Sequence, residues 1–183
     1  MAPSPDPRSV WLLGTGTDEF ASLLPVDEND FDRLEPLDGT PMAASWTPFP
    51  ARWDTDGGLP VPDVASLEAP ALAARGRDAL AELLAGSVEE LPLEVAGGPS
   101  AVLLNVTHLS DALDEAASDV KRFPDGRFMR AVTHVFDLAA LEGHSIFKLR
   151  QAPRTWVYVT GAVVARIHDA GLTGADVRQV WAP

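Results

Sequence analysis

The side chains best suited to acid–base or metal chemistry in this chain of 183 residues are 27 Asp and Glu residues and four histidines, and there is no cysteine. The histidines show neither HExxH nor HxH spacing, by which two imidazoles of one element reach one metal ion. Two histidines are followed three residues later by an aspartate, in His108–Asp111 and His134–Asp137. The first pair spans a predicted helix start and the second a predicted strand end, so neither spacing guarantees that the two side chains lie on one face of an element. The sequence therefore predicts no metal site and no cofactor. The four histidines are His108, His134, His144 and His168.

Covalent and nucleotide chemistry lack their usual signatures. Without cysteine there is no thiolate nucleophile, and no GxSxG motif presents a serine. Residues 14–16, Gly-Thr-Gly, begin like a phosphate-binding turn, but the third glycine and the lysine of such loops are missing. Asp18 and Glu19 would repel a phosphate, so we expect a plain turn. Carboxylates are plentiful, which leaves open a small enzyme whose carboxylate or histidine site is assembled by the fold, but no residue is assigned a catalytic role.

The net charge of −13 is unevenly distributed. Residues 1–94 contain 18 acidic side chains and 5 arginines, whereas residues 95–183 contain nine acidic and nine basic side chains. A field of this sign repels nucleic acid and anionic membranes and attracts a cationic partner. The same acidity also keeps a protein soluble, so the charge alone leaves both interpretations open.

Two neighbouring stretches of the acidic half are the candidates for a partner surface. Residues 27–38 are rich in carboxylates, yet Phe31, Leu34 and Leu37 are spaced so that one side can pack. Residues 41–62 contain repeated proline, which predicts neither a long helix nor a central strand. Aromatic side chains in such a stretch either pin a loop to the core, the commoner outcome, or form a recognition surface. The hypothetical partner-binding residues are Asp27, Glu28, Asp30, Asp32, Trp46 and Trp53.

The C-terminal residues 155–181 read as strand, helix and strand. The β-branched and aromatic run 156–159 suits a buried strand, and Thr160 is a helix N-cap candidate. Val163, Ile167 and Ala170 recur at helical spacing, and Gly171 fits the left-handed position that ends a helix. The connection is long enough for a parallel βαβ unit, and an antiparallel arrangement stays open.

The remaining periodicities predict a single α+β domain with a mixed or antiparallel sheet and a few short helices. Its parts are a loose tail (residues 1–8), an irregular acidic stretch (9–62) and a regular stretch (63–183). Strands are predicted at 9–13, 128–136 and 146–149, a hairpin at 91–106, and a turn at 124–126. A helix is predicted at 70–85, and a short helix is predicted to start at Ser110 with an apolar stripe that ends at Val120. A single helical turn is predicted between Asp137 and Gly143.

From residue 59 onward the chain resembles the immunity-protein-eleven family of bacterial polymorphic toxin systems, first described as a myxobacterial domain. The similar stretches are mostly packing and turn residues, so they point to a fold family more than to a mechanism. They are Leu59–Asp63, Leu91–Leu93, Leu104–Val106, Asp111–Asp114, Val135–Asp137, Leu141–Leu149, Val157–Thr160 and Gly171–Gly174.

The resemblance implies a protein that binds and neutralises a cognate toxin and carries no catalytic residues of its own. The expected partner is a toxin with a basic surface, not nucleic acid or membrane, and the oligomeric state is left undecided. A cytoplasmic location is expected because cysteine is absent, the first residues lack a secretory signal pattern, and no apolar run has the length of a membrane span. The alternatives are the small hydrolase or transferase described above and a structural module of a secretion assembly.

Overall fold

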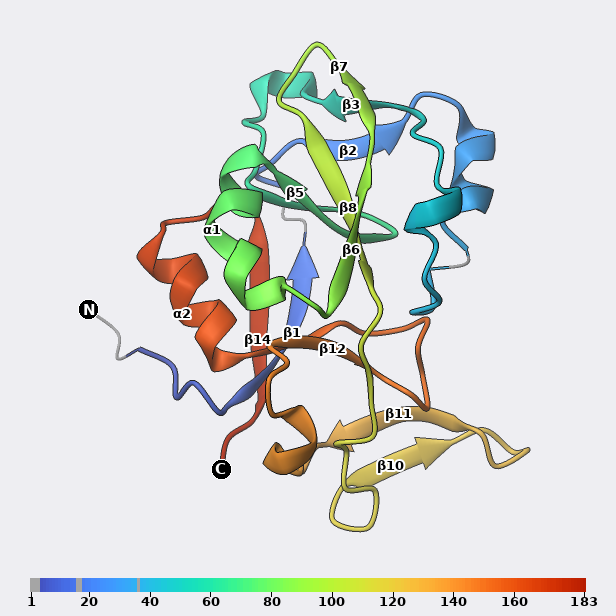
Figure 1. The fold of residues 1–183 in the computed structure, drawn as a ribbon, viewed down its shortest axis with the longest axis vertical. Coiled ribbons are helices and arrows are strands. Elements are labelled where there is room, and N and C mark those ends of the chain that lie inside the picture. Colours follow the sequence, from blue (N-terminus) through green and yellow to red (C-terminus); the bar gives the residue numbers. More distant parts are fainter. Residues whose placement is uncertain (1–3, 16–17, 36) are drawn as a thin grey trace.

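Four β-sheets and two α-helices build the fold over residues 4–15, 18–35 and 37–183, which the computed structural model describes (Figure 1). The chain is a single α+β domain, as predicted. Its largest sheet has the order β14-β1-β13-β12-β9, and only the pair β12/β9 is parallel. Its strands are β1 (Val10–Thr15), β9 (Leu109–Ser110), β12 (Ile146–Leu149), β13 (Tyr158–Thr160) and β14 (Ala175–Trp181).

The C-terminal unit is a parallel βαβ crossover with one strand inserted. Strands β13 and β14 both pair antiparallel with β1, which lies between them, so they run parallel to each other. Helix α2 (Gly161–Asp169) connects them and buries Val163 and Ile167, which confirms the predicted apolar stripe. Gly171 has φ 57°, as a helix end of this kind requires. The Thr160 hydroxyl does not cap the helix and has no hydrogen-bond partner within the described residues.

In the four-stranded antiparallel sheet and its helix, two elements begin at other residues than predicted. The predicted helix 70–85 begins only at Ala74, because all five residues of β5 (Ala69–Ala73) are buried in a strand. Gly76 permits the helix to lie close to the chain before β4, since an added Cβ would stand 2.4 Å from the Asp63 carbonyl oxygen. The predicted hairpin 91–106 is formed by β6 and β8 and starts three residues earlier. The other elements are β4 (Val64–Leu67), α1 (Ala74–Leu84), β6 (Val88–Pro92) and β8 (Ala101–Val106).

The stretch 9–62, predicted to be irregular, supplies two strands of a three-stranded sheet. Its order is β2-β3-β7, with β2 antiparallel and β7 parallel to the central β3. Pro50 does not prevent this because it is the first residue of β3, where a missing N–H is tolerated. The elements are β2 (Ser22–Pro25), β3 (Pro50–Asp54), β7 (Glu94–Ala96) and the 3₁₀-helices η1 (Glu28–Arg33), η2 (Ala43–Ser45) and η3 (Asp56–Gly58).

A two-stranded hairpin, β10 (Asp119–Arg122) and β11 (Phe128–Thr133), extends from the lower end of the molecule in Figure 1. Its turn contains Gly126 at φ 84°, as the predicted turn requires. The helix predicted after Ser110 does not form. The Ser110 hydroxyl does accept the Ala112 N–H, but the buried Leu113 then pairs with Phe136 in an isolated β-bridge, which holds this segment extended.

The predicted strand 128–136 ends at Thr133, and the predicted helical turn after it is the 3₁₀-helix η4 (Leu138–Leu141). The Asp137 carboxylate caps η4 by accepting the Ala139 N–H at 3.0 Å. The described part of the predicted loose tail is anchored, because the Asp6 carbonyl accepts the Ser9 N–H at 2.9 Å and lies against Gly161.

Three apolar clusters form the interior. One lies between the three-stranded and four-stranded sheets, a second between the helices and the two larger sheets, and a third on the other face of the five-stranded sheet. The acidic segment that contains η1 packs on the first cluster, and the hairpin packs on the edge of the third. Neither α-helix of the described residues is long and apolar enough to cross a membrane.

Candidate functional site

The acidic residues predicted to bind a partner are placed by η1. Asp27 caps this 3₁₀-helix by accepting the Asn29 N–H at 2.9 Å, and Glu28 and Asp30 lie in its first turn, where the helix dipole favours negative charge. Asp27, Glu28 and Asp32 are exposed. We name residues 26–35 the acidic face.

Two apolar side chains stand among these carboxylates. Val26 is 59% exposed and Phe31 is 37% exposed, whereas Leu34 and Leu37 are buried beneath. A 3₁₀-helix has about three residues per turn, so Phe31 and Leu34 fall on one side. Phe31 is the member of that row that reaches the surface. The spacing of Phe31, Leu34 and Leu37 was visible in the sequence, but periodicity alone does not tell which of the three leaves the core.

Arg33 joins the acidic face to Trp46. Its guanidinium pairs with the Asp30 carboxylate at 3.1 Å and lies 5.4 Å from the centre of the Trp46 ring and 4.9 Å from that of Phe49. The indole of the half-buried Trp46 donates to the Pro92 carbonyl at 2.8 Å. The structure thus brings together the predicted residues Asp30 and Trp46 through an arginine that the sequence reasoning did not consider.

Trp53 is a core residue, which contradicts the prediction that it belongs to an exposed recognition surface. It lies in β3, the central strand of its sheet, and is 7% exposed. Its indole donates to the Pro99 carbonyl at 3.0 Å. Gly98 closes over the ring so tightly that an added Cβ would lie 2.7 Å from it. The stretch 41–62 therefore pins itself to the core through Trp53, the alternative that the sequence left open.

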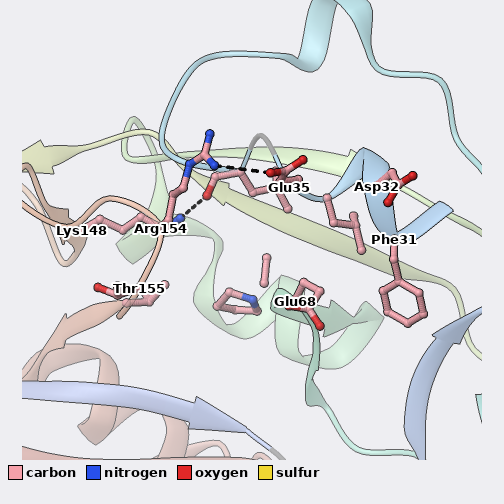
Figure 2. A pocket seen from close by; sticks show the side chains of 12 residues that line it. Phe31, Asp32, Glu35, Glu68, Lys148, Arg154 and Thr155 are labelled. Atoms are coloured by element: carbon pink, nitrogen blue, oxygen red, sulfur yellow. Dashed lines mark hydrogen bonds and ion pairs between the residues drawn. The ribbon is translucent and has the colours of Figure 1, made fainter. Parts of the chain in front are cut away.

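Beside the acidic face lies a groove of about 650 Å³ (Figure 2). Its lining comes from the segment 31–37, the β4–β5 turn, Lys148 of β12 and residues 154–157 before β13. Leu34, Leu37, Pro70 and Val157 give it apolar walls. The full lining is Phe31, Asp32, Leu34, Glu35, Leu37, Glu68, Ala69, Pro70, Lys148, Arg154, Thr155 and Val157.

One end of the groove holds two cations, Lys148 and Arg154 (Figure 2). Lys148 is 5% exposed, and its ammonium donates to the Leu37 carbonyl at 2.5 Å. Burial lowers the pKa of Lys148, and the nearby Asp38 carboxylate partly offsets this. Arg154 pairs with Glu35 at 3.7 Å and with Asp38 at 3.6 Å. Both cations therefore fasten the end of the acidic segment to the main sheet.

Glu68 stands in the β4–β5 turn in an unusual backbone conformation. Its φ is 58°, the left-handed region, which costs a residue with a Cβ about 1–2 kcal/mol. This conformation turns β4 directly into β5, because Leu67 pairs with Ala69 across it. The Glu68 carboxylate consequently lies at the mouth of the groove (Figure 2).

The arrangement closest to an enzyme site lies elsewhere and was not foreseen from the sequence. The Ser87 hydroxyl lies 2.9 Å from Nδ1 of His144, whose ring stacks on His108 with 3.5 Å between ring centres and 9° between planes. Burial, then His144 and Arg150, lower the pKa of His108. Ser87 is 0% exposed, however, so its hydroxyl is closed to an external substrate. This cluster joins the end of α1 to the loops before β9 and β12.

No three His, Asp or Glu side chains of the described residues form a group that could hold a metal ion. No protein-family model matches the chain, and a search of curated proteins gives no significant match.

Proposed function

We propose that this protein is an immunity-type binding protein that neutralises a cognate toxin in the cytoplasm of the producing cell, without catalysis of its own. Its acidic face docks on a basic surface of the toxin. One observation carries the proposal. Val26 and Phe31 are exposed, and nearby carboxylates, which include those of Glu28 and Asp32, form no ion pair with any cation of the described residues.

The acidic face supplies both parts of a specific interface. Its surplus charge speeds the encounter with a basic partner and selects against acidic ones. Charge alone adds little affinity in salt, because exposed charges are screened within about 8 Å at physiological ionic strength. The apolar anchor comes from Phe31 and Val26, whose burial on binding removes hydrocarbon surface from water.

The acidic face is also preformed, which reduces the entropy lost on binding. Leu34 and Leu37 are buried beneath it, Asp27 caps η1, and Arg33 clamps Asp30 to the aromatic pair behind it. The resemblance of residues 59–183 to immunity proteins supports the choice of partner class, whereas the surface itself indicates only a basic protein.

The test uses the product of the gene next to this protein's own, purified as a stable complex and then separated. Association with the Glu28→Gln/Asp32→Asn variant should be about tenfold slower at low salt and less dependent on salt, because two steering charges are removed. The matched control is Asp78→Asn/Glu82→Gln, which removes two exposed carboxylates from α1, on the left in Figure 1, whereas η1 lies on the right.

The proposal fails if the neighbouring product does not bind, or if the two double variants slow association equally. Circular dichroism spectra of both variants should match that of the unmodified protein, which verifies that both are folded. Neither Glu28 nor Asp32 makes a side-chain hydrogen bond or ion pair with the described residues, so folding should not change.

A further inference from the structure

The groove beside the acidic face has walls suited to an aliphatic side chain. Leu34 and Leu37 from the segment after η1, Pro70 from β5 and Val157 from before β13 line it with apolar groups. Phe31 borders the end away from Lys148 and Arg154, and part of its ring is exposed (Figure 2). A long, unbranched side chain from a partner would find hydrocarbon along its stem and an aromatic ring near its tip.

The charges at the two ends of the groove are not equivalent. Lys148 and Arg154 already have partners within the protein, namely the Leu37 carbonyl and the Glu35 and Asp38 carboxylates. The side chains of Glu68, which lies between the Lys148 end and Phe31, and of Asp32, the neighbour of Phe31, make no hydrogen bond or ion pair with the described part of the chain (Figure 2). The unpaired charge of the groove is therefore negative and lies on the Phe31 side of Lys148 and Arg154 (Figure 2).

We propose that this groove binds the side chain of an arginine carried by the basic partner, with the stem against the apolar walls and the guanidinium stacked on Phe31 next to the Glu68 carboxylate. This inference rests on the proposed function and names the chemistry that the groove recognises. Asp32 adds to the attraction without a required contact.

Arginine suits the groove better than lysine for two physical reasons. Its planar guanidinium stacks on an aromatic face and keeps its donors free for a carboxylate at the ring edge. It is also more weakly hydrated than an ammonium, so its transfer into a groove with apolar walls costs less. Anions are disfavoured, since Arg154 is already paired with Glu35 and Asp38 and the buried Lys148 ammonium already donates to the Leu37 carbonyl.

The test is an NMR titration of the ¹⁵N-labelled full chain with N-acetyl-arginine amide, whose only charge is the guanidinium. The matched ligand is N-acetyl-citrulline amide, which has nearly the same shape and no charge. The arginine derivative should shift the amides of Phe31, Glu68 and Val157 saturably, and the citrulline derivative should bind at least about tenfold more weakly because it lacks the charge-assisted contact.

Two variants locate the guanidinium. Glu68→Gln should weaken the arginine derivative about fivefold or more, and Phe31→Leu should weaken it while preserving apolar contact. Asp78→Asn on α1 is the matched control and should leave the affinity unchanged. The inference is overturned if both ligands bind alike, if the shifts lie outside the groove, if Glu68→Gln has no effect, or if sodium acetate shifts the Lys148 end more strongly than the arginine derivative shifts the Phe31 end.

The outcome is separable from that of the proposed function. If the neighbouring gene product binds through the acidic face but N-acetyl-arginine amide does not enter the groove, the proposed function stands and this inference fails. If the arginine derivative binds as expected but the gene product does not, the groove recognises arginine and the proposed partner is wrong.

Discussion

The acidic face and the β10–β11 hairpin both expose large apolar side chains, but they differ in what lies beneath and around them. The acidic face carries Val26 and Phe31 and rests on buried Leu34 and Leu37. The hairpin exposes Phe123, Met129 and Val132, and no residue of either strand is fully buried. The first is thus a supported surface, and the second is a two-stranded ribbon with little core of its own.

Their charges differ as well. In the hairpin, Arg127 pairs with Asp125 at 2.7 Å and Lys121 with Asp119 at 3.6 Å, and Arg122 pairs with Glu115, so both acids are neutralised and the remaining charge is positive. On the acidic face, Arg33 neutralises Asp30 and leaves Glu28 and Asp32 unpaired within the described residues. Exposed apolar area alone therefore does not distinguish the two regions. A supported backbone and an uncancelled negative charge distinguish the acidic face.

The largest expected effect is a loss of stability on substitution of Trp53, a residue of the core and not of the acidic face. Trp53→Ala should lower the free energy of unfolding by about 3–5 kcal/mol, because it removes a buried indole and leaves a cavity. Urea denaturation measures the loss. The folded fraction of the Trp53→Ala variant should dissociate from the partner at the unchanged rate. Normal stability together with faster dissociation would show that Trp53 contacts the partner.

Leu34→Ala tests whether the acidic face depends on its buried underside. The side chain is 3% exposed, so its truncation should cost about 2–5 kcal/mol of unfolding free energy. Ile167→Ala, in α2 and remote from both regions, should cost a similar amount and serves as the control. Partner affinity should fall in the Leu34 variant and not in the Ile167 variant, and equal affinities would show that the surface does not need this support.

Acidification should loosen the base of the hairpin before it affects the acidic face. His134 follows β11 and lies 3.3 Å from the Tyr158 hydroxyl, and burial, with Arg178, lowers the pKa of this histidine. The pKa of His108 is lowered too. Unfolded histidine takes up a proton at about pH 6.5, so this stabilisation is complete above that pH and is lost below it.

The melting temperature should consequently fall between pH 7.5 and pH 5.5, and it should fall less in His134→Gln than in the unmodified protein. Calorimetry at matched ionic strength measures both. A melting temperature that stays level or rises over this range would contradict the assigned direction.

The smallest expected effect is in the hairpin itself. Val132→Ser should change the free energy of unfolding by no more than about 0.5 kcal/mol, since the side chain is exposed. It should also leave partner binding unchanged. A marked loss of affinity in this variant would make the hairpin a second partner surface.

The sequence predicted the C-terminal βαβ unit well because its signals were local and agreed with one another. A β-branched run, an apolar stripe that includes Ile167, and Gly171 at the helix end all pointed to the same structure. The predicted buried strand 156–159 was wrong in one respect, because β13 begins at Tyr158 and Trp156 is 52% exposed. The α+β class followed from the same kind of agreement. By contrast, residues 70–73 have a helix-like composition and form a strand, because pairing with β4 and β8 overrides local preference.

The candidate site was predicted only in part, for a physical reason. The carboxylates of η1 were recognisable from composition, but the roles of the two tryptophans depend on contacts with Pro92 and Pro99, far along the chain. The groove is lined both by Phe31 and by Glu68, which are far apart in the chain, and no local pattern encodes that arrangement. The prolines of residues 41–62 do not exclude a central strand, because Pro50 stands at the start of β3, where a missing N–H is tolerated.

The most direct test of the acidic face as the partner surface is hydrogen–deuterium exchange of the free protein and of its complex with the neighbouring gene product. We expect slower exchange on binding in residues 26–35 and at Glu68, and unchanged exchange in the hairpin at residues 119–133. Protection confined to the hairpin, with residues 26–35 unaffected, would contradict the central claim.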